Sequence, residues 1–201
     1  MKGFRPYVVS LLLTAGLLLI CVAPLLACVG KSLVIGSTGT VQQELLAEIV
    51  SQLISERTGT SVKIVRFDTP AAAQDALMKA DLDIALEYTG AVQADVLKGA
   101  PIKDPQKLYE AVKTRYNEEL NLIWLQPFGF DEPRVTKEEL PAQAAPVVRK
   151  DTLKKFPALA RLLNKLGGTI DQSTIQNLET GANQDNIHEL ARNFLKTKRL
   201  I

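Results

Sequence analysis

Two short polar turns, each directly after an apolar run, hold the residues of this 201-residue chain that are best suited to bind a charged ligand. The first turn follows the run SLVIG and the second follows IALE. Hydroxyls and backbone amides at a helix start can hold an anionic group. A tyrosine ring can hold a cation against its face. The candidate ligand residues are Ser37, Thr38, Gly39, Thr40, Tyr88, Thr89 and Gly90.

Capping residues mark the helices that must position these turns. Thr40 stands three residues before Gln43, the spacing of a capping box, and the helix that follows is expected to end before Gly59. Thr69 and Asp104 are each followed by proline, a pairing that favours a helix start. The segments between these helices alternate or are continuously apolar, as strands are. Strands are predicted at 32–36, 61–67, 82–88 and 121–130, and helices at 41–58, 71–80 and 105–119.

This alternation predicts an α/β fold with a doubly wound, mostly parallel sheet that has helices on both faces. In such sheets ligands bind beyond the carboxyl ends of the strands. If the first and third strands are neighbours, the two turns face each other across one edge of a cleft. A carboxylate at the first turn and a cation against the ring of Tyr88 would then suit a zwitterion.

Composition argues against nucleic acid as a partner and against catalysis. The chain has 24 Lys and Arg against 22 Asp and Glu, and the excess lies in Lys2 and Arg5, so no basic stripe is left for nucleic acid. His188 is the only histidine and has no nucleophile arrangement around it. Glu87 has no partner carboxylate in its motif. We therefore expect no enzyme activity, no catalytic residue, no metal site and no cofactor.

Residues 1–28 have the layout of an export leader, with two basic residues ahead of a long apolar run. The tetrapeptide at 25–28, LLAC, resembles the bacterial lipoprotein signal, in which a lipid is attached to the sulfur of Cys28. Two alternatives remain: the run stays in the bilayer as an uncleaved anchor, or it is removed at Ala27. All three interpretations place the rest of the chain outside the cytoplasmic membrane.

Beyond the leader, several segments are informative when taken together: LVIGS, DLDIALEYTG, DPQKLYEAVK and NLIWLQPFGF, and the tail segments AAPVVRKDTLKKFPALARLLNKLGGTI and IHELARNFLKTKRLI. In this order they resemble the substrate-binding proteins of osmoprotectant ABC importers. The resemblance covers nearly all of 32–130 and 142–201. It implies a type II periplasmic-binding-protein-like fold with C-terminal helices, a quaternary amine such as glycine betaine or choline as ligand, and an ABC permease subunit as partner.

The family's second lobe has no counterpart in this chain. Family members insert that lobe after the segment matching GFDE, whereas here residues 131–146 pass directly from the outgoing crossing to the returning one. A short helix is predicted within this passage, from Thr136 to Leu140. Residues 29–201 are therefore expected to form a single lobe, and closure around a ligand cannot occur within one chain.

The ligand turns also depart from the family pattern. Thr38 stands where the family commonly has a lysine, and Ala91 stands where a hydroxyl is frequent, although the Tyr-Thr-Gly motif carries over. Phe128 and Phe130 are the candidate additional rings of an aromatic cage. Because each ring contributes only about 0.5 to 2 kcal/mol, an isolated lobe is expected to bind betaine weakly if at all, with an affinity nearer millimolar than micromolar.

The resemblance thus predicts an extracytoplasmic, lipid-anchored substrate-binding component of an ABC importer for quaternary amines, or else a degenerate remnant or one half of such a receptor. The alternative is an interaction or regulatory protein without a receptor role. Such a protein would dock a transporter subunit, a second copy of itself or a separate second lobe through the surface that the missing lobe exposes. A homo-oligomer is compatible with either interpretation.

Overall fold

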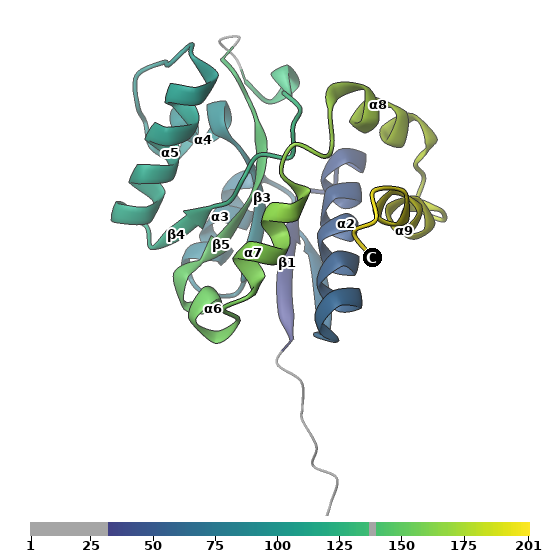
Figure 1. Ribbon diagram of the computed structural model, residues 1–201. Helices are drawn as coiled ribbons and strands as arrows, with labels where there is room; N and C mark the ends of the chain where they lie inside the picture. The colour runs from purple at the N-terminus through teal and green to yellow at the C-terminus, as the bar shows by residue number, and fades with distance from the viewer. Residues whose placement is uncertain (1–31, 137–139) are drawn as a thin grey trace, which may run out of the picture. The chain divides into compact units, whose positions relative to one another are not determined.

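A five-stranded mixed sheet runs through the part of the chain that the computed structural model describes, residues 32–136 and 140–201 (Figure 1). The strand order is β2-β1-β3-β5-β4. β1 is parallel to β2 and β3, whereas β5 is antiparallel to both of its neighbours. The strands are β1 (Leu33–Ser37), β2 (Val62–Arg66), β3 (Ile84–Tyr88), β4 (Leu122–Trp124) and β5 (Ala144–Arg149).

β1 and β3 are neighbours in this sheet, with Ile35 opposite Ile84. Their carboxyl ends therefore meet at one edge, as the expected cleft requires. The mixed α/β architecture agrees with the prediction, and the returning strand β5 adds the antiparallel pairing.

Helices cover both faces of the sheet (Figure 1). One hydrophobic core contains residues of α2, α7, α8 and α9, and the other contains residues of α3, α4 and α5. The helices are α2 (Val41–Thr58), α3 (Pro70–Met78), α4 (Thr89–Asp95), α5 (Pro105–Glu119), α6 (Lys150–Lys155), α7 (Leu159–Leu163), α8 (Gln172–Gly181) and α9 (Ile187–Thr197), with single 3₁₀ turns η1 (Pro133–Val135) and η2 (Asn164–Leu166).

The predicted helix caps are confirmed. The Thr40 side chain accepts a hydrogen bond from the Gln43 amide at 3.2 Å, and α2 ends at Gly59, which adopts a left-handed φ of 69°. Thr69 and Asp104 likewise accept from the backbone amides three residues on, at 3.1 and 2.8 Å. These caps fix the start of each helix next to the carboxyl edge of the sheet.

The fourth predicted strand is shorter than expected. The prediction covered 121–130, whereas β4 ends at Trp124. Pro127 interrupts the run and has no N–H with which to continue a ladder. Isolated bonds from the Leu125 and Phe128 amides to the returning segment still guide the chain along β5.

Two other predictions fall in the crossing and the leader. Thr136 and Leu140 are not helical, and residues 137–139 of the predicted short helix lie outside the described residues. The leader, including Cys28, also lies outside them. Within 32–136 and 140–201, no helix combines the length and the apolar character needed to cross a bilayer.

Candidate functional site

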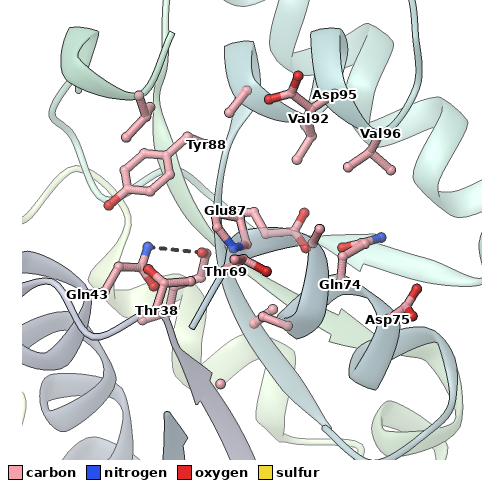
Figure 2. Close-up of a pocket in the computed structure, with 18 of the residues that line it drawn as sticks. Thr38, Gln43, Thr69, Gln74, Asp75, Glu87, Tyr88, Val92, Asp95 and Val96 are labelled. Carbon is pink, nitrogen blue, oxygen red and sulfur yellow. Dashed lines mark hydrogen bonds between the residues drawn. The ribbon is translucent and has the colours of Figure 1, made fainter. Parts of the chain in front are cut away.

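A cavity of about 770 Å³ opens at the carboxyl ends of the parallel strands. Its walls come from the turn after β1, the start of α3, the end of β3 and the adjoining helix α4 (Figure 2). The residues that line it are Gly36, Thr38, Thr40, Gln43, Asp68, Thr69, Pro70, Ala71, Ala73, Gln74, Asp75, Ala85, Leu86, Glu87, Tyr88, Ala91, Val92, Asp95, Val96 and Val135.

Tyr88 lies at the point where β3 meets this cavity, and 9% of it is exposed. Its hydroxyl donates a hydrogen bond of 2.5 Å to Oε1 of the buried Gln42. Burial raises the pKa of the Tyr88 phenol, so the ring stays neutral across the physiological pH range. The phenol oxygen is therefore held in a polar contact while the ring forms part of the wall.

That contact is the first link of a polar network. Gln42 Nε2 donates to Glu132 at 2.6 Å, and Glu132 in turn accepts from Nε of Arg134 at 2.6 Å. Arg134 also reaches Glu179 at 3.1 Å. The hydrogen bonds from Arg134 hold the pKa of the buried Glu132 below its ordinary value. Through this network Tyr88 is connected to α2, to the segment 131–146 and to α8.

The first turn is only partly directed at the cavity. Thr38 and Thr40 line it, but Ser37 is buried and its hydroxyl accepts a hydrogen bond from the Gly39 amide at 3.3 Å. The Gln43 amide is taken by the cap of α2. Two donors of the expected anion site are thus already used within the turn.

Thr89 and Gly90 hold the crossing segment rather than line the cavity. The Thr89 hydroxyl accepts from the Gln143 amide at 3.0 Å and donates to the Pro141 carbonyl at 3.3 Å. A Cβ at Gly90 would lie 2.5 Å from that same carbonyl oxygen. Only glycine permits this close approach. The second half of the Tyr-Thr-Gly motif therefore packs the turn against the returning chain.

Phe128 and Phe130 do not reach the cavity. They are 0% and 3% exposed and belong to the core that contains α2 and α9. Among the described residues that line the cavity, Tyr88 is the only aromatic side chain. The seven candidate ligand residues and two candidate cage residues thus reduce to Thr38, Thr40 and Tyr88 as direct lining.

Glu87 and Gln74 line the cavity on the other side of β3 from Tyr88. Neither residue is among the predicted ligand residues. Burial raises the pKa of Glu87 to about 7, an effect that the Tyr116 hydroxyl partly offsets. Glu87 Oε2 and both side-chain polar atoms of Gln74 are buried without a hydrogen-bond partner among the described residues. A glutamate within an otherwise apolar strand was the available signal.

Gln43 is a further lining residue outside the predicted set. Its Nε2 donates to the Leu86 carbonyl at 3.1 Å, across from β3 (Figure 2). This bond joins the start of α2 to the end of β3, the two elements that bring Thr40 and Tyr88 to one cavity. In the described ranges no group of His, Cys, Asp and Glu side chains is arranged to hold a metal ion.

Comparison with known protein families yields one match over most of the chain. The family described as "Substrate binding domain of ABC-type glycine betaine transport system" matches residues 31–134 and 136–197. The two matched segments meet within the crossing between β4 and β5.

Two relatives agree with this match. The carnitine transport binding protein of Listeria monocytogenes is 30% identical over 184 residues, covering 87% of this chain and 56% of the relative. An ergothioneine transport permease/ergothioneine binding protein of Helicobacter pylori is 34% identical over 106 residues, covering 50% of this chain and 18% of the relative. The chain thus spans about half the length of the carnitine-binding relative.

Solved structures show the same fold. A crystal structure of a glycine betaine/carnitine/choline ABC transporter superposes with a TM-score of 0.77 at 17% identity, covering 85% of this chain and 98% of that chain. At this identity the similarity establishes the fold and leaves the ligand open. It agrees with the predicted type II periplasmic-binding-protein architecture.

Proposed function

The chain belongs to the family of substrate-binding domains of ABC-type glycine betaine transport systems, and from this membership we propose that it binds a quaternary amine for an ABC importer. The family is one of binding domains and not of enzymes. The relatives are named for carnitine and ergothioneine transport. These compounds and glycine betaine share a trimethylammonium group, which suggests the same group in the ligand of this chain.

The observation that carries the proposal is the meeting of Tyr88 with Thr38 and Thr40 at one cavity. A quaternary ammonium group cannot donate a hydrogen bond, so it is recognised by an aromatic face and by nearby negative charge. Tyr88 supplies such a face, and its hydroxyl is held by Gln42, which limits rotation of the ring. Apolar lining from Ala91 and Val92 suits the methyl groups.

The affinity of this arrangement is expected to be low. A single ring contributes about 0.5 to 2 kcal/mol to the binding of a cation, whereas micromolar affinity requires about 8 kcal/mol. The remaining contribution would come from an opposite wall of the site. We propose that residues 131–146 replace the lobe that forms this wall in family members, a view supported by the break between the two matched segments and by the 56% coverage of the carnitine-binding relative.

Titration calorimetry with glycine betaine, choline and carnitine tests the receptor role. The leaderless chain should bind at least one of them in the millimolar range. Tyr88→Phe keeps the ring and should retain binding, whereas Tyr88→Leu removes the ring and should abolish it. Circular dichroism of both variants checks that they are folded. If neither the wild type nor either variant gave a binding signal, the proposed receptor role would be contradicted.

A second candidate is a half-site completed by another polypeptide. Val135 in the crossing segment lines the cavity and is 37% exposed, so an apolar side chain borders the open side. A second copy of the chain or a separate second lobe would cover it. Size-exclusion chromatography with light scattering separates the two candidates, because a tight dimer without ligand response favours the half-site and a ligand-responsive monomer favours the simple receptor.

We further propose that the chain is exported and anchored through a lipid on Cys28, with the permease subunit as its partner at the outer face of the membrane. Support comes from the LLAC tetrapeptide at 25–28 and from family membership. Metabolic labelling with a radioactive fatty acid should mark the wild type and leave Cys28→Ser unlabelled. Labelling of both proteins would contradict the lipid attachment, and retention of an unlabelled full-length chain in the membrane would favour the uncleaved anchor.

A further inference from the structure

Two unpartnered polar side chains face each other inside the cavity. Glu87 extends from the end of β3 and Gln74 from α3, and their polar ends point toward one another (Figure 2). Glu87 Oε2, Gln74 Oε1 and Gln74 Nε2 are all buried, and none makes a hydrogen bond of ordinary length and angle within the described chain. The Tyr116 hydroxyl, which also lacks such a bond, lies close enough to Glu87 to lower its pKa. Buried polar groups without partners are rare because each lacks the hydrogen bonds that water would provide. Two such groups on one cavity indicate a place for a ligand group.

The charge of the lining indicates the sign of that ligand. Four carboxylate side chains border the cavity, and no lysine, arginine or histidine belongs to its described lining. Arg66 and Arg134 are engaged in ion pairs, since Arg66 pairs with Glu44 and Arg134 pairs with Glu132 and Glu179. The four carboxylates belong to Asp68, Asp75, Glu87 and Asp95. Asp75 is paired with Lys79 at 3.3 Å, so a ligand carboxylate would meet like charge mainly from the other three lining carboxylates.

We infer that Glu87 and Gln74 form a second subsite, which receives an O–H or N–H group of a cationic ligand, so that the chain prefers choline-type amino alcohols to carboxylate-bearing zwitterions. This inference rests on the proposed function, because it takes the trimethylammonium group to lie against Tyr88. The hydroxyl of choline can donate to the Glu87 carboxylate, and a small movement of the Gln74 side chain would let it accept from the Gln74 amide. Glycine betaine would bring a carboxylate to the same place and leave Glu87 unsatisfied.

Neighbouring positions on β3 explain how one ligand reaches both subsites. Residues 87 and 88 are consecutive, so their side chains leave the strand on opposite sides. Both nevertheless line the cavity because β3 ends there. Ala85 and Val92 supply apolar surface beside them. A short ligand with a methylated end and a donor end matches this distribution.

The protonation of Glu87 links binding to pH. Burial raises its pKa to about 7, so the carboxyl is partly protonated near neutrality. The titratable groups around it are Tyr116 of α5, which lowers this pKa, and the lining carboxylates Asp68, Asp75 and Asp95 from the elements beside it. A bound cation favours the ionised form. Choline binding should therefore release a proton and strengthen as the pH rises from 6 to 8.

The test measures choline and glycine betaine binding to the leaderless wild type and to Glu87→Gln at pH 6 and pH 8. At pH 8 the wild type should bind choline about tenfold more tightly than glycine betaine, the size of a hydrogen bond to a charged group. Glu87→Gln should lose most of this preference and its pH dependence. Glu118→Gln, an exposed glutamate on α5 away from the cavity, is the matched control and should behave as the wild type.

The outcomes separate this inference from the proposed function. A wild type that binds glycine betaine as tightly as choline, or a Glu87→Gln variant with an unchanged preference, would overturn the subsite and leave the receptor standing. Silence of the wild type with every ligand would overturn both. Gln74→Leu provides a second readout that does not alter charge: it should weaken choline several-fold and leave glycine betaine unaffected, and equal losses for both ligands would contradict the subsite.

Discussion

Two consecutive residues of β3, Glu87 and Tyr88, differ in the hydrogen bonding of their side chains. Tyr88 belongs to a continuous polar network, in which its hydroxyl reaches Gln42 and, through Gln42, the Glu132–Arg134 pair. Glu87 is half-buried, yet its Oε2 is buried and has no hydrogen bond of ordinary geometry in the described residues. One side of the strand end is satisfied within the protein, and the other side is left unsatisfied.

The difference distinguishes side chains that stabilise the fold from side chains that are available to bind a ligand. A satisfied network stabilises the fold and holds a ring in place, whereas an unpartnered buried group costs stability until a ligand reaches it. Substitutions on the two sides of β3 should therefore change the free energy of unfolding with opposite signs.

The largest effect is expected from Glu87→Gln, which should raise the free energy of unfolding at pH 8 by about 3 kcal/mol. The folded protein holds the Glu87 proton more tightly than the unfolded chain, with a pKa of about 7 against 4.5. Its stability therefore falls as the pH rises through this window, and a neutral amide removes that loss. Urea unfolding of the wild type and of Glu87→Gln at pH 5 and pH 8 measures this difference. If the wild type were equally stable at the two pH values and equal to the variant, the raised pKa of Glu87 would be contradicted.

On the satisfied side, Glu132→Ala should lower the free energy of unfolding by about 2 to 3 kcal/mol at pH 7, because Gln42 and Arg134 lose a charged acceptor. The pKa of Glu132 is lowered in the folded protein. Its contribution is therefore present above the ordinary glutamate pKa and is lost as the pH falls through the lowered value. Glu179→Ala, a more exposed partner of Arg134, serves as control with a loss under about 1 kcal/mol.

Tyr88→Phe should cost about 1 to 2 kcal/mol, since Gln42 Oε1 loses its donor in a buried position. Chemical denaturation of the single variants and of the double variant with Gln42→Leu forms a mutant cycle. The cost of Tyr88→Phe should shrink when Gln42 is already absent, because the two side chains act as a pair. Additive losses would show that the network does not extend to the phenol.

The smallest effect is expected from Gln74→Leu, which should raise the free energy of unfolding by about 1 kcal/mol. The substitution removes two unpartnered buried atoms and places an apolar side chain of similar size in α3. Thermal unfolding detects the change, and Gln106→Leu, an exposed glutamine on α5, controls for the general effect of leucine in a helix. If Gln74→Leu lost stability and Gln106→Leu did not, the Gln74 amide would have a hydrogen-bond partner, which would contradict its unsatisfied state.

The stabilising substitutions are the ones that should impair ligand discrimination. Glu87→Gln and Gln74→Leu relieve unsatisfied groups, and both remove the subsite inferred from those groups. A gain in stability at the expense of recognition is common where a binding site is built from strained or unsatisfied residues. Joint measurement of unfolding and binding in the same variants therefore tests the fold and the function together.

Local signals in the sequence predicted most of the parallel half of the fold. Thr40, Thr69 and Asp104 each cap a helix as their spacing indicated, and Gly59 ends α2. These features depend on residues a few positions apart, so a sequence shows them directly. α4 was missed, because it follows Tyr88 at once and has no capping side chain. β4 was overextended because an apolar run alone does not mark where pairing stops.

The candidate site was predicted less completely than the fold. Thr38, Thr40 and Tyr88 line the cavity, because the rule for carboxyl ends of parallel strands depends on topology. Phe128 and Phe130 were proposed as cage rings, but they pack into the core. Phe128 and Phe130 follow the short strand β4, and the direction of their side chains depends on long-range packing. A local sequence pattern does not show such packing. For the same reason the presence of Glu87 and Gln74 in one cavity could not be predicted from their spacing in the sequence.

The outgoing and returning chains lie next to each other at the bridge between Asp131 and Gln143. The Asp131 carboxylate also accepts from the backbone of Ala142, and the Glu132 amide donates to the Ala142 carbonyl. A folded module spliced between these two points would enter and leave through adjacent stems, without pulling on β3 or β5. The adjacency of these two points means that the length of the connecting segment can change there with little effect on the pairing of β3 with β5.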